Sequence, residues 1–178
     1  MMKCFYYLSP TLDISKKVSD DLHEAGLLDW YLHVISKDED GLNQKHIHSS
    51  NYLETLDLFR GTTVGGAIGF VFALFVVAMA VVFEPYGQPL SNTVYFLILL
   101  FFTLFGVWEG GLWGIDSENK KIKPFHDEIE KGKYLVLVYA AKEEEESITG
   151  MMKTKHPESK LVGVDSHFIN PFSKLKMV

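Results

Sequence analysis

Two long runs of apolar residues occupy the middle of the chain, and the segments on either side are mixed in polarity. The runs are Val64–Phe83 and Thr93–Trp108, and residues 84–92 form a short loop between them. A helix needs about 20 apolar residues to cross the roughly 30 Å core of a bilayer. The first run meets this length without a charged residue, and the second meets it if it continues to Trp113. Because the loop is short, the pattern predicts an antiparallel transmembrane hairpin.

The flanking segments alternate between strand and helix patterns. Short apolar and aromatic runs predict four strands, at Lys3–Leu8, Trp30–Ser36, Tyr134–Ala140 and Lys160–Val164. Apolar residues at helical spacing predict helices at Leu12–Ala25, Ile122–Lys131 and Lys142–Lys155. We also expect a turn at Lys37–Gly41 and an amphipathic lead-in to the hairpin at Tyr52–Phe59. Residues 42–50 receive no assignment.

The order strand–helix–strand, hairpin, strand–helix–strand predicts an α+β membrane protein with a ferredoxin-like cytoplasmic domain split by the inserted hairpin. Residues 1–60 would form the N-terminal half of this domain, residues 61–116 the hairpin, and residues 117–178 the C-terminal half and a tail. Each half alone has too few strands to be stable, so we expect one four-stranded sheet. The tail, residues 166–178, either packs on the domain or rests on anionic lipid headgroups.

Small residues recur at four-residue spacing in both apolar runs, in the pattern of a glycine zipper. The predicted helix-packing residues are Gly61, Gly65, Gly69, Gly106, Gly110 and Gly114. In lipid, close approach of backbones through small residues drives helix association. The two series are expected at the same depth, and they either pack within one hairpin or join neighbouring subunits.

Charge sets the expected topology and excludes one class of partner. The formal net charge of −6 argues against binding to nucleic acid. Arg60 precedes the first apolar run, three lysines (Lys120, Lys121 and Lys123) follow the second, and the loop between them carries no Lys or Arg. The positive-inside rule therefore places both chain ends in the cytoplasm. The single cysteine, Cys4, excludes an intramolecular disulfide and a multi-cysteine metal site, and we expect it to be buried in a strand.

Glu109 is the acidic residue of the second apolar run, about 6 Å inside its cytoplasmic end at 1.5 Å per residue. A carboxylate at that depth has a partner, faces a cavity or marks a pathway, and Arg60 on the first helix is the candidate partner. The preferred interpretation is that Glu109 extends to the interface between Trp108 and Trp113, which suit an aromatic belt.

His46 and His48 are the candidate metal ligands, with His33, Asn51 and Glu54 near them in sequence. No cysteine or clear third ligand completes the set, so surface histidines are the preferred interpretation. The acidic run 143–146 fits a first helical turn, which the helix dipole already favours. The sequence contains no nucleotide-binding or hydrolase motif. It therefore predicts no catalytic residue, no cofactor and no enzymatic activity.

Several short motifs span most of the chain. They are Leu32-His33-Val34-Ile35-Ser36 with Asp38 and Asp40, His46 with His48, Trp108-Glu109-Gly110-Gly111-Leu112-Trp113-Gly114-Ile115, Asn119, Phe125, Gly132-Lys133, and His156-Pro157 with Gly163. In these the chain resembles a family of uncharacterised, chiefly gammaproteobacterial, two-helix inner-membrane proteins, some labelled magnesium transporter. Its layout is also similar to that of the two-helix membrane component of alternative complex III, a respiratory assembly. The resemblance implies a bacterial inner membrane and a split soluble domain, and it identifies no active site.

Three functions follow as hypotheses. The leading one is a non-enzymatic membrane protein that self-assembles or serves as an accessory subunit of a larger membrane complex, with a cytoplasmic scaffold or sensor domain. The second is an oligomeric ion channel or divalent-cation transporter lined by Glu109, because two helices alone cannot enclose a pore. A membrane-tethered enzyme is the least favoured of the three.

Overall fold

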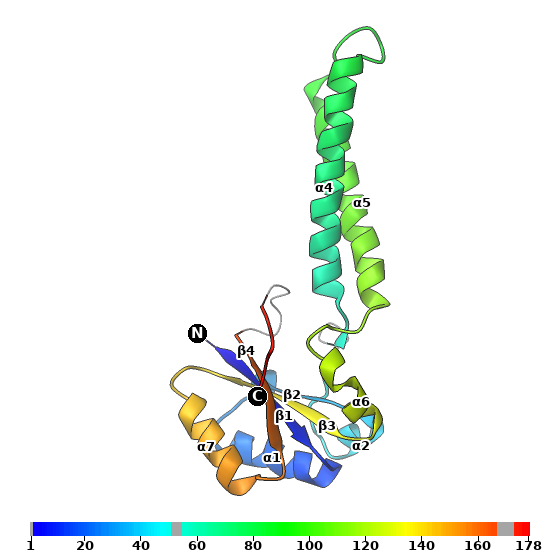
Figure 1. Cartoon of the computed structure of the whole chain (residues 1–178). Coiled ribbons are helices and arrows are strands. Elements are labelled where there is room, and N and C mark those ends of the chain that lie inside the picture. The colour runs from blue at the N-terminus through cyan, green and yellow to red at the C-terminus, as the bar shows by residue number, and fades with distance from the viewer. Residues whose placement is uncertain (1, 51–54, 167–172) are drawn as a thin grey trace. The chain divides into compact units, whose positions relative to one another are not determined.

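Five antiparallel strands form one sheet in the order β2-β3-β1-β4-β5 (Figure 1). The strands are β1 Lys3–Ser9, β2 Leu32–Ile35, β3 Tyr134–Ala140, β4 Lys160–Asp165 and β5 Lys176–Met177. The structure is a computed structural model, which describes residues 2–50, 55–166 and 173–178. Because β1 lies between β3 and β4, a strand from the start of the chain pairs on both sides with strands from its end.

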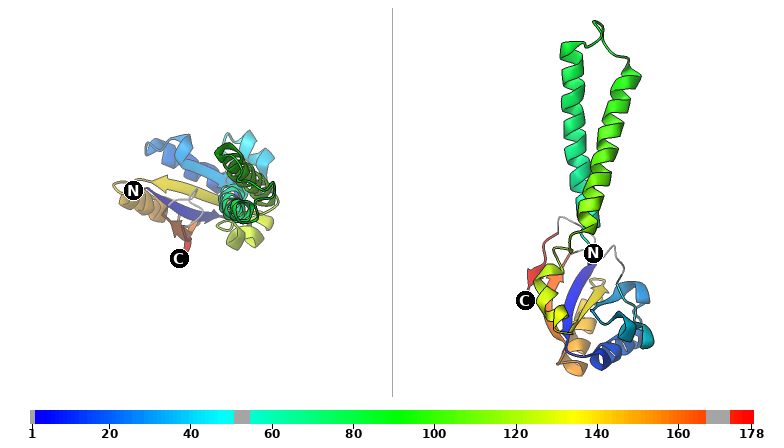
Figure 2. Two further views of the ribbon diagram at one scale, coloured as in Figure 1. Left: turned by 90° about the horizontal axis from the view of Figure 1, so that it is seen from above. Right: turned by 90° about the vertical axis from the view of Figure 1, so that its right-hand side faces the viewer.

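The described residues divide into two compact units. One combines Met1–Thr55 with Lys120–Val178 and contains the sheet, and the other is Leu56–Asn119. The second unit consists of the long helices α4 (Leu58–Phe83) and α5 (Asn92–Ile115), which run antiparallel as a hairpin (Figure 2).

One face of the sheet is covered by helices that connect its strands (Figure 1). These helices are α1 Leu12–Glu24, α2 Glu39–Gln44 and α7 Glu145–Lys155. Val18 and Leu22 of α1 and Met152 of α7 are buried there against apolar side chains of β1, β2 and β3. The predicted helical spacing of α1 therefore marks its buried face.

The opposite face of the sheet holds a second apolar cluster. Cys4 and Tyr6 of β1 and Leu137 of β3 point to this side, as expected from the alternation of side chains along a strand. The short helices η2 (Lys123–Phe125) and α6 (His126–Glu130) bury Phe125 and Ile129 against them. The strand β3 is buried on both faces, which explains its unbroken apolar sequence.

Three helices of the sheet unit end in the same way. After α1, α2 and α6 the chain takes a left-handed conformation at Gly26, His46 and Gly132, with φ of 95°, 53° and 85°. In each case the amide of the following residue bonds back to a carbonyl in the last turn of the helix, as Ile47 does to Leu42 at 2.9 Å. This is the Schellman motif, which satisfies carbonyls that the helix leaves unpaired.

The structure corrects several expected boundaries. The segment Lys37–Gly41, expected as a turn, opens helix α2, because the Asp38 carboxylate caps it by accepting from the Gly41 amide at 3.0 Å. Strand β2 is shorter than Trp30–Ser36, since residues 29–31 form the 3₁₀ turn η1 (Asp29–Tyr31).

Two further corrections lie in the C-terminal half. Helix α7 begins at Glu145 rather than Lys142, and the tail adds the fifth strand, β5, to the four that were expected. The expected lead-in Tyr52–Phe59 lies partly outside the described residues, as does much of the tail.

Candidate functional site

The helices α4 and α5 are long enough to cross a bilayer. They contain 26 and 24 residues, which at 1.5 Å per residue correspond to about 39 and 36 Å, against a hydrocarbon core of about 30 Å. Their most apolar 18-residue windows are only 11% and 6% buried. A core helix of a soluble domain would be mostly buried, and a signal sequence would stand at the N-terminus. Among the described residues, these two helices are therefore the candidate membrane spans.

The helix-packing glycines lie between these two helices. Gly61, Gly65 and Gly69 of α4 lie against Gly106, Gly110 and Gly114 of α5, or against backbone atoms close to them. A Cβ atom added to Gly65 would lie 2.2 Å from the Gly106 carbonyl oxygen, and one added to Gly110 would lie 2.1 Å from that of Gly61. Both are far inside contact distance, so only glycine permits this approach. We call these six residues the glycine seam.

The glycine seam packs the two helices of one chain against each other. Ala73, fully buried, continues it along α4. Two threonine hydroxyls of the helices bond to the backbone of their own helix: those of Thr62 and Thr103 donate to the Leu58 and Leu99 carbonyls at 3.0 and 2.6 Å. The hairpin is thus a self-contained pair that presents its other faces outward.

Large apolar side chains form the outward faces of the hairpin. They include Ile68, Phe75, Val82, Phe101 and Leu104, all exposed. Trp108 and Trp113 are exposed near one end of the pair, and Tyr86 is exposed in the loop at the other. Aromatic residues at both ends of an apolar span are typical of the membrane–water interfaces.

Arg60 and Glu109 do not form an ion pair with each other in the structure. The Arg60 guanidinium lies 3.8 Å from the Asp57 carboxylate, one turn earlier on α4, instead of pairing with Glu109. Glu109 is half-buried and has no hydrogen bond or ion pair with another described residue. The candidate Arg60–Glu109 pair is not formed, and Arg60 makes a local pair at the start of α4, where Asp57 is the N-cap residue.

His46 and His48, the candidate metal ligands, contribute through their backbone: one ends a helix and the other extends a strand edge. His46 supplies the left-handed residue that ends α2, and its side chain is exposed. The His48 carbonyl accepts from the Val34 amide at 3.0 Å, extending the edge of β2, and its ring lies edge-on to the buried His33 ring at 5.2 Å. Within residues 2–50, 55–166 and 173–178 no group of three His, Cys, Asp or Glu side chains could hold a metal ion. Asn51 and Glu54 lie outside the described residues.

The structure contains a buried ion pair beside the sheet that the sequence did not predict. The Lys121 ammonium lies 2.5 Å from the Asp165 carboxylate, and both side chains are buried. The Ser173 hydroxyl accepts from Lys121 at 2.7 Å and donates to Asp165 at 3.2 Å. A buried charge needs a partner of this kind, so the three residues hold together the segment after the hairpin, the end of β4 and the tail.

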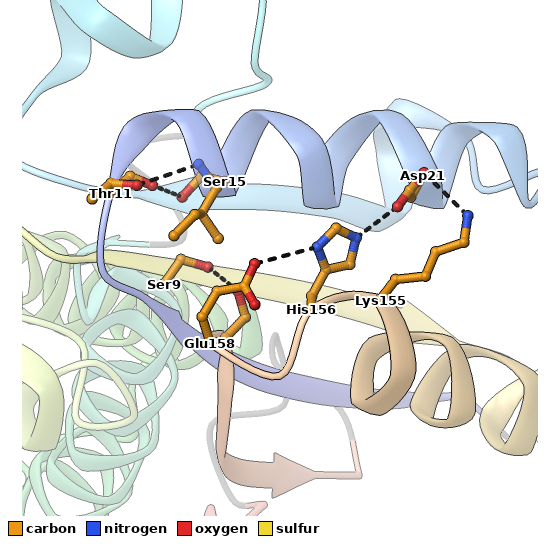
Figure 3. A network of polar contacts seen from close by, with 9 residues as sticks. Ser9, Thr11, Ser15, Asp21, Lys155, His156 and Glu158 are labelled. Atoms are coloured by element: carbon orange, nitrogen blue, oxygen red, sulfur yellow. Dashed lines mark hydrogen bonds and ion pairs between the residues drawn. The ribbon is translucent and has the colours of Figure 1, made fainter.

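A second polar network joins α1 to the end of α7 (Figure 3). Asp21 of α1 lies 2.8 Å from Nε2 of the buried His156 and 3.2 Å from the Lys155 ammonium. Glu158 lies 3.9 Å from the other ring nitrogen of His156. The hydrogen bond from Lys155, with a further contribution from His156, lowers the pKa of the Asp21 carboxyl below its usual value. The network fixes the packing of α1 against the end of α7.

Sequence reasoning missed both polar networks because their members are far apart in the chain. Lys121 and Asp165, or Asp21 and His156, come together only through the pairing of β1 with β4 and the packing of α1 beside α7. Only the His156-Pro157 dipeptide, which carries part of the resemblance, drew attention to this region.

Comparison with protein-family models, with curated proteins and with solved structures finds no match to this chain. The family resemblance stays a prediction.

Proposed function

We propose that the chain is a two-pass protein of the bacterial inner membrane whose hairpin anchors a cytoplasmic domain, and that it works without catalysis as an accessory subunit or scaffold. The observation that carries this proposal is the pair of long helices with almost entirely exposed apolar surfaces. Soluble monomers rarely expose apolar surface of this extent, because its contact with water is unfavourable. In a bilayer the same side chains contact lipid instead of water.

The domain would be ferredoxin-like and split by the hairpin. The strand order β2-β3-β1-β4 and the repeated strand–helix–strand order, with α1 and α7 on one face, support this assignment. Its two halves come from either side of α4 and α5 in the chain. The lysines after α5 and the absence of Lys and Arg from the loop support a cytoplasmic location.

The glycine seam bears on how the protein would assemble. Because all six glycines are used between α4 and α5 of one chain, further association would use the outward faces. Those faces are rich in Phe, Leu and Val, which pack against lipid or against another membrane protein. This supports an accessory subunit of a larger complex over a homo-oligomer joined by its glycines.

Native mass spectrometry in a mild detergent tests this proposal. We expect the 20.2 kDa chain to appear with additional mass, either from further copies or from a membrane partner retained during extraction. A single species at the mass of one chain, from membranes solubilised gently enough to preserve known complexes, would contradict the proposed assembly.

Glu109 favours a second candidate, an oligomeric cation channel or transporter. Its half-buried carboxylate, without a partner among the described residues, could line a path between hairpins. Cation flux into liposomes that is lost in Glu109→Gln would support this function. Absence of flux for monovalent and divalent cations in the wild type would remove it.

A further inference from the structure

Among the described residues of the sheet unit, most of the exposed large apolar side chains lie in a single turn. Among its described residues, the exposed large apolar side chains are those of Leu28, Trp30, Tyr31, Met177 and Val178. Three of these five lie within four consecutive residues, with exposed fractions of 62% for Leu28, 77% for Trp30 and 39% for Tyr31. We call Leu28–Tyr31 the aromatic turn.

The backbone of the aromatic turn is held in place although its side chains are exposed. The Tyr31 amide donates to the Leu28 carbonyl at 2.9 Å, and Nε2 of the buried His33 donates to the Trp30 carbonyl at 3.0 Å. The His23 ring lies 2.8 Å from the Asp29 carboxylate. Leu27, just before the turn, is buried in the core. The fold therefore presents Leu28 and Trp30 to the outside on a fixed support.

Strand register places the aromatic turn at a defined edge of the sheet. Val138 of β3 pairs with Leu32, the first residue of β2, and also with Phe5 near the start of β1. Cys4, one residue earlier in β1, pairs with Asp165, the last residue of β4. The aromatic turn and the end of β4 thus share one edge, separated by three strand spacings, or about 14 Å.

The chain arrives from the hairpin at this same edge. Lys121, bonded to the buried Asp165, follows the last residue of α5, Ile115, by only six residues. An extended chain of six residues spans at most about 20 Å. At most about 20 Å of chain therefore separates the end of α5 from the edge that carries the aromatic turn.

We propose that the aromatic turn is a second membrane contact, with Leu28 and Trp30 inserted among the lipid headgroups and the upper acyl chains. This rests on the proposed membrane location of the hairpin. Tryptophan suits this zone because its ring is apolar and its N–H can bond to water or headgroups. The occupant is the lipid interface in general rather than an anionic headgroup, since the charged residue within the turn is the acidic Asp29.

Depth-dependent fluorescence quenching tests the insertion on the full chain in liposomes. The sequence has three tryptophans, so Trp108→Phe and Trp113→Phe together leave Trp30 as the single reporter. The vesicles contain phosphatidylcholine brominated either near the headgroup end or near the methyl end of the acyl chains. A matched control adds Trp30→Phe and Lys153→Trp, which moves the reporter to an exposed position near the end of α7, at the opposite edge of the sheet.

We expect Trp30 to lose about half of its fluorescence with bromine near the headgroups and little with bromine near the methyl ends, as suits an interfacial ring. The reporter at position 153 should be unaffected by either lipid. A variant with Trp108 as the single tryptophan reports on the hairpin separately. Quenching of Trp108 without quenching of Trp30 overturns this inference, leaves the membrane location intact and points to a protein partner or to solvent at the turn. Absence of quenching at both positions overturns the membrane location as well.

Discussion

His46 has a left-handed backbone conformation, with φ of 53°, at the residue that ends α2. Two helices of the same domain use glycine at the equivalent position, because a Cβ atom in this conformation is strained. Histidine is tolerated here since Ile47 and Leu42, on either side of the turn, are buried in the core and fix the chain. The conformation of a single residue thus explains a histidine that its spacing from His48 had marked as a possible ligand.

His46→Gly should stabilise the domain by up to about 1 kcal/mol, because relief of the left-handed strain exceeds the entropy that glycine adds to the unfolded chain. Gly26→Ala, at φ of 95° after α1, is the matched opposite and should destabilise it by about 1 kcal/mol. Urea unfolding of the full chain in mild detergent measures both. A loss of stability in His46→Gly would show that the imidazole makes an essential interaction.

Asp21 makes the stability of the domain depend on pH. Its pKa is lowered in the folded state by Lys155 and His156, so its contribution to the free energy of unfolding is complete above its ordinary pKa, near 4. That contribution is lost as the pH falls through the lower, folded-state pKa. Asp21→Asn should therefore lower the urea midpoint at pH 7, and the difference from wild type should shrink below about pH 4. Asp20→Asn, an exposed neighbour paired with Lys16, should show a smaller difference at pH 7.

At the scale of elements, the glycine seam defines the hairpin. The apolar runs and the four-residue spacing of glycines predicted two helices and a close contact, and the structure has both helices and places the glycines between them. The spacing alone could not decide between contact within a chain and contact between chains, because both bury the same helical face. The short loop between α4 and α5 favours the contact within one chain, as the structure has it.

Gly65→Val should destabilise the hairpin by about 1–3 kcal/mol, since its side chain would meet the backbone carbonyl of Gly106, which can yield only if the helices separate. Ala67→Val, two residues away on an exposed face of α4, should change the stability little. Thermal unfolding in mild detergent, followed by circular dichroism of the helices, compares the two variants. Equal effects would mean that the glycine seam does not hold α4 against α5.

Some of the other elements could be predicted from the sequence pattern and some could not. The four strands and the helix α1 were predicted because their apolar runs and periods are clear. Helix α2 was missed since its start depends on the capping carboxylate of Asp38 and its end on His46, which is not a usual stop residue. The two-residue strand β5 is too short to have a period, and only its pairing with β4 defines it.

At the scale of the whole molecule, the sheet unit depends on chain segments from both sides of the hairpin. Strand β1 is paired with β3 and β4, and β2 with β3, so the first half of the chain supplies two strands that do not pair with each other. Neither half can form the sheet alone. The buried Lys121–Asp165 pair adds a contact between the segment after the hairpin and the end of β4.

Truncation after Gly132, which removes β3, α7, β4 and β5, should therefore unfold the N-terminal half as well. Amide hydrogen exchange over β1 and α1 should lose its protection throughout, because opening then costs almost no free energy. Removal of residues 176–178, which deletes only the edge strand β5, is the control and should leave β1 protected. Protected amides in β1 of the longer truncation would contradict the interdependence of the two halves.

Site-directed cysteine labelling tests the central claim, that a membrane-crossing hairpin interrupts one domain whose two parts meet on the inner side. In a Cys4→Ala background, single cysteines at Gln88 in the loop, Lys17 of α1 and Val178 report on the three segments, and all three positions are exposed. With a membrane-impermeant maleimide on intact cells, we predict labelling of position 88 alone, and labelling of positions 17 and 178 only after the membrane is opened. Labelling of 17 and 178 from opposite sides, or of all three from outside, would contradict the account.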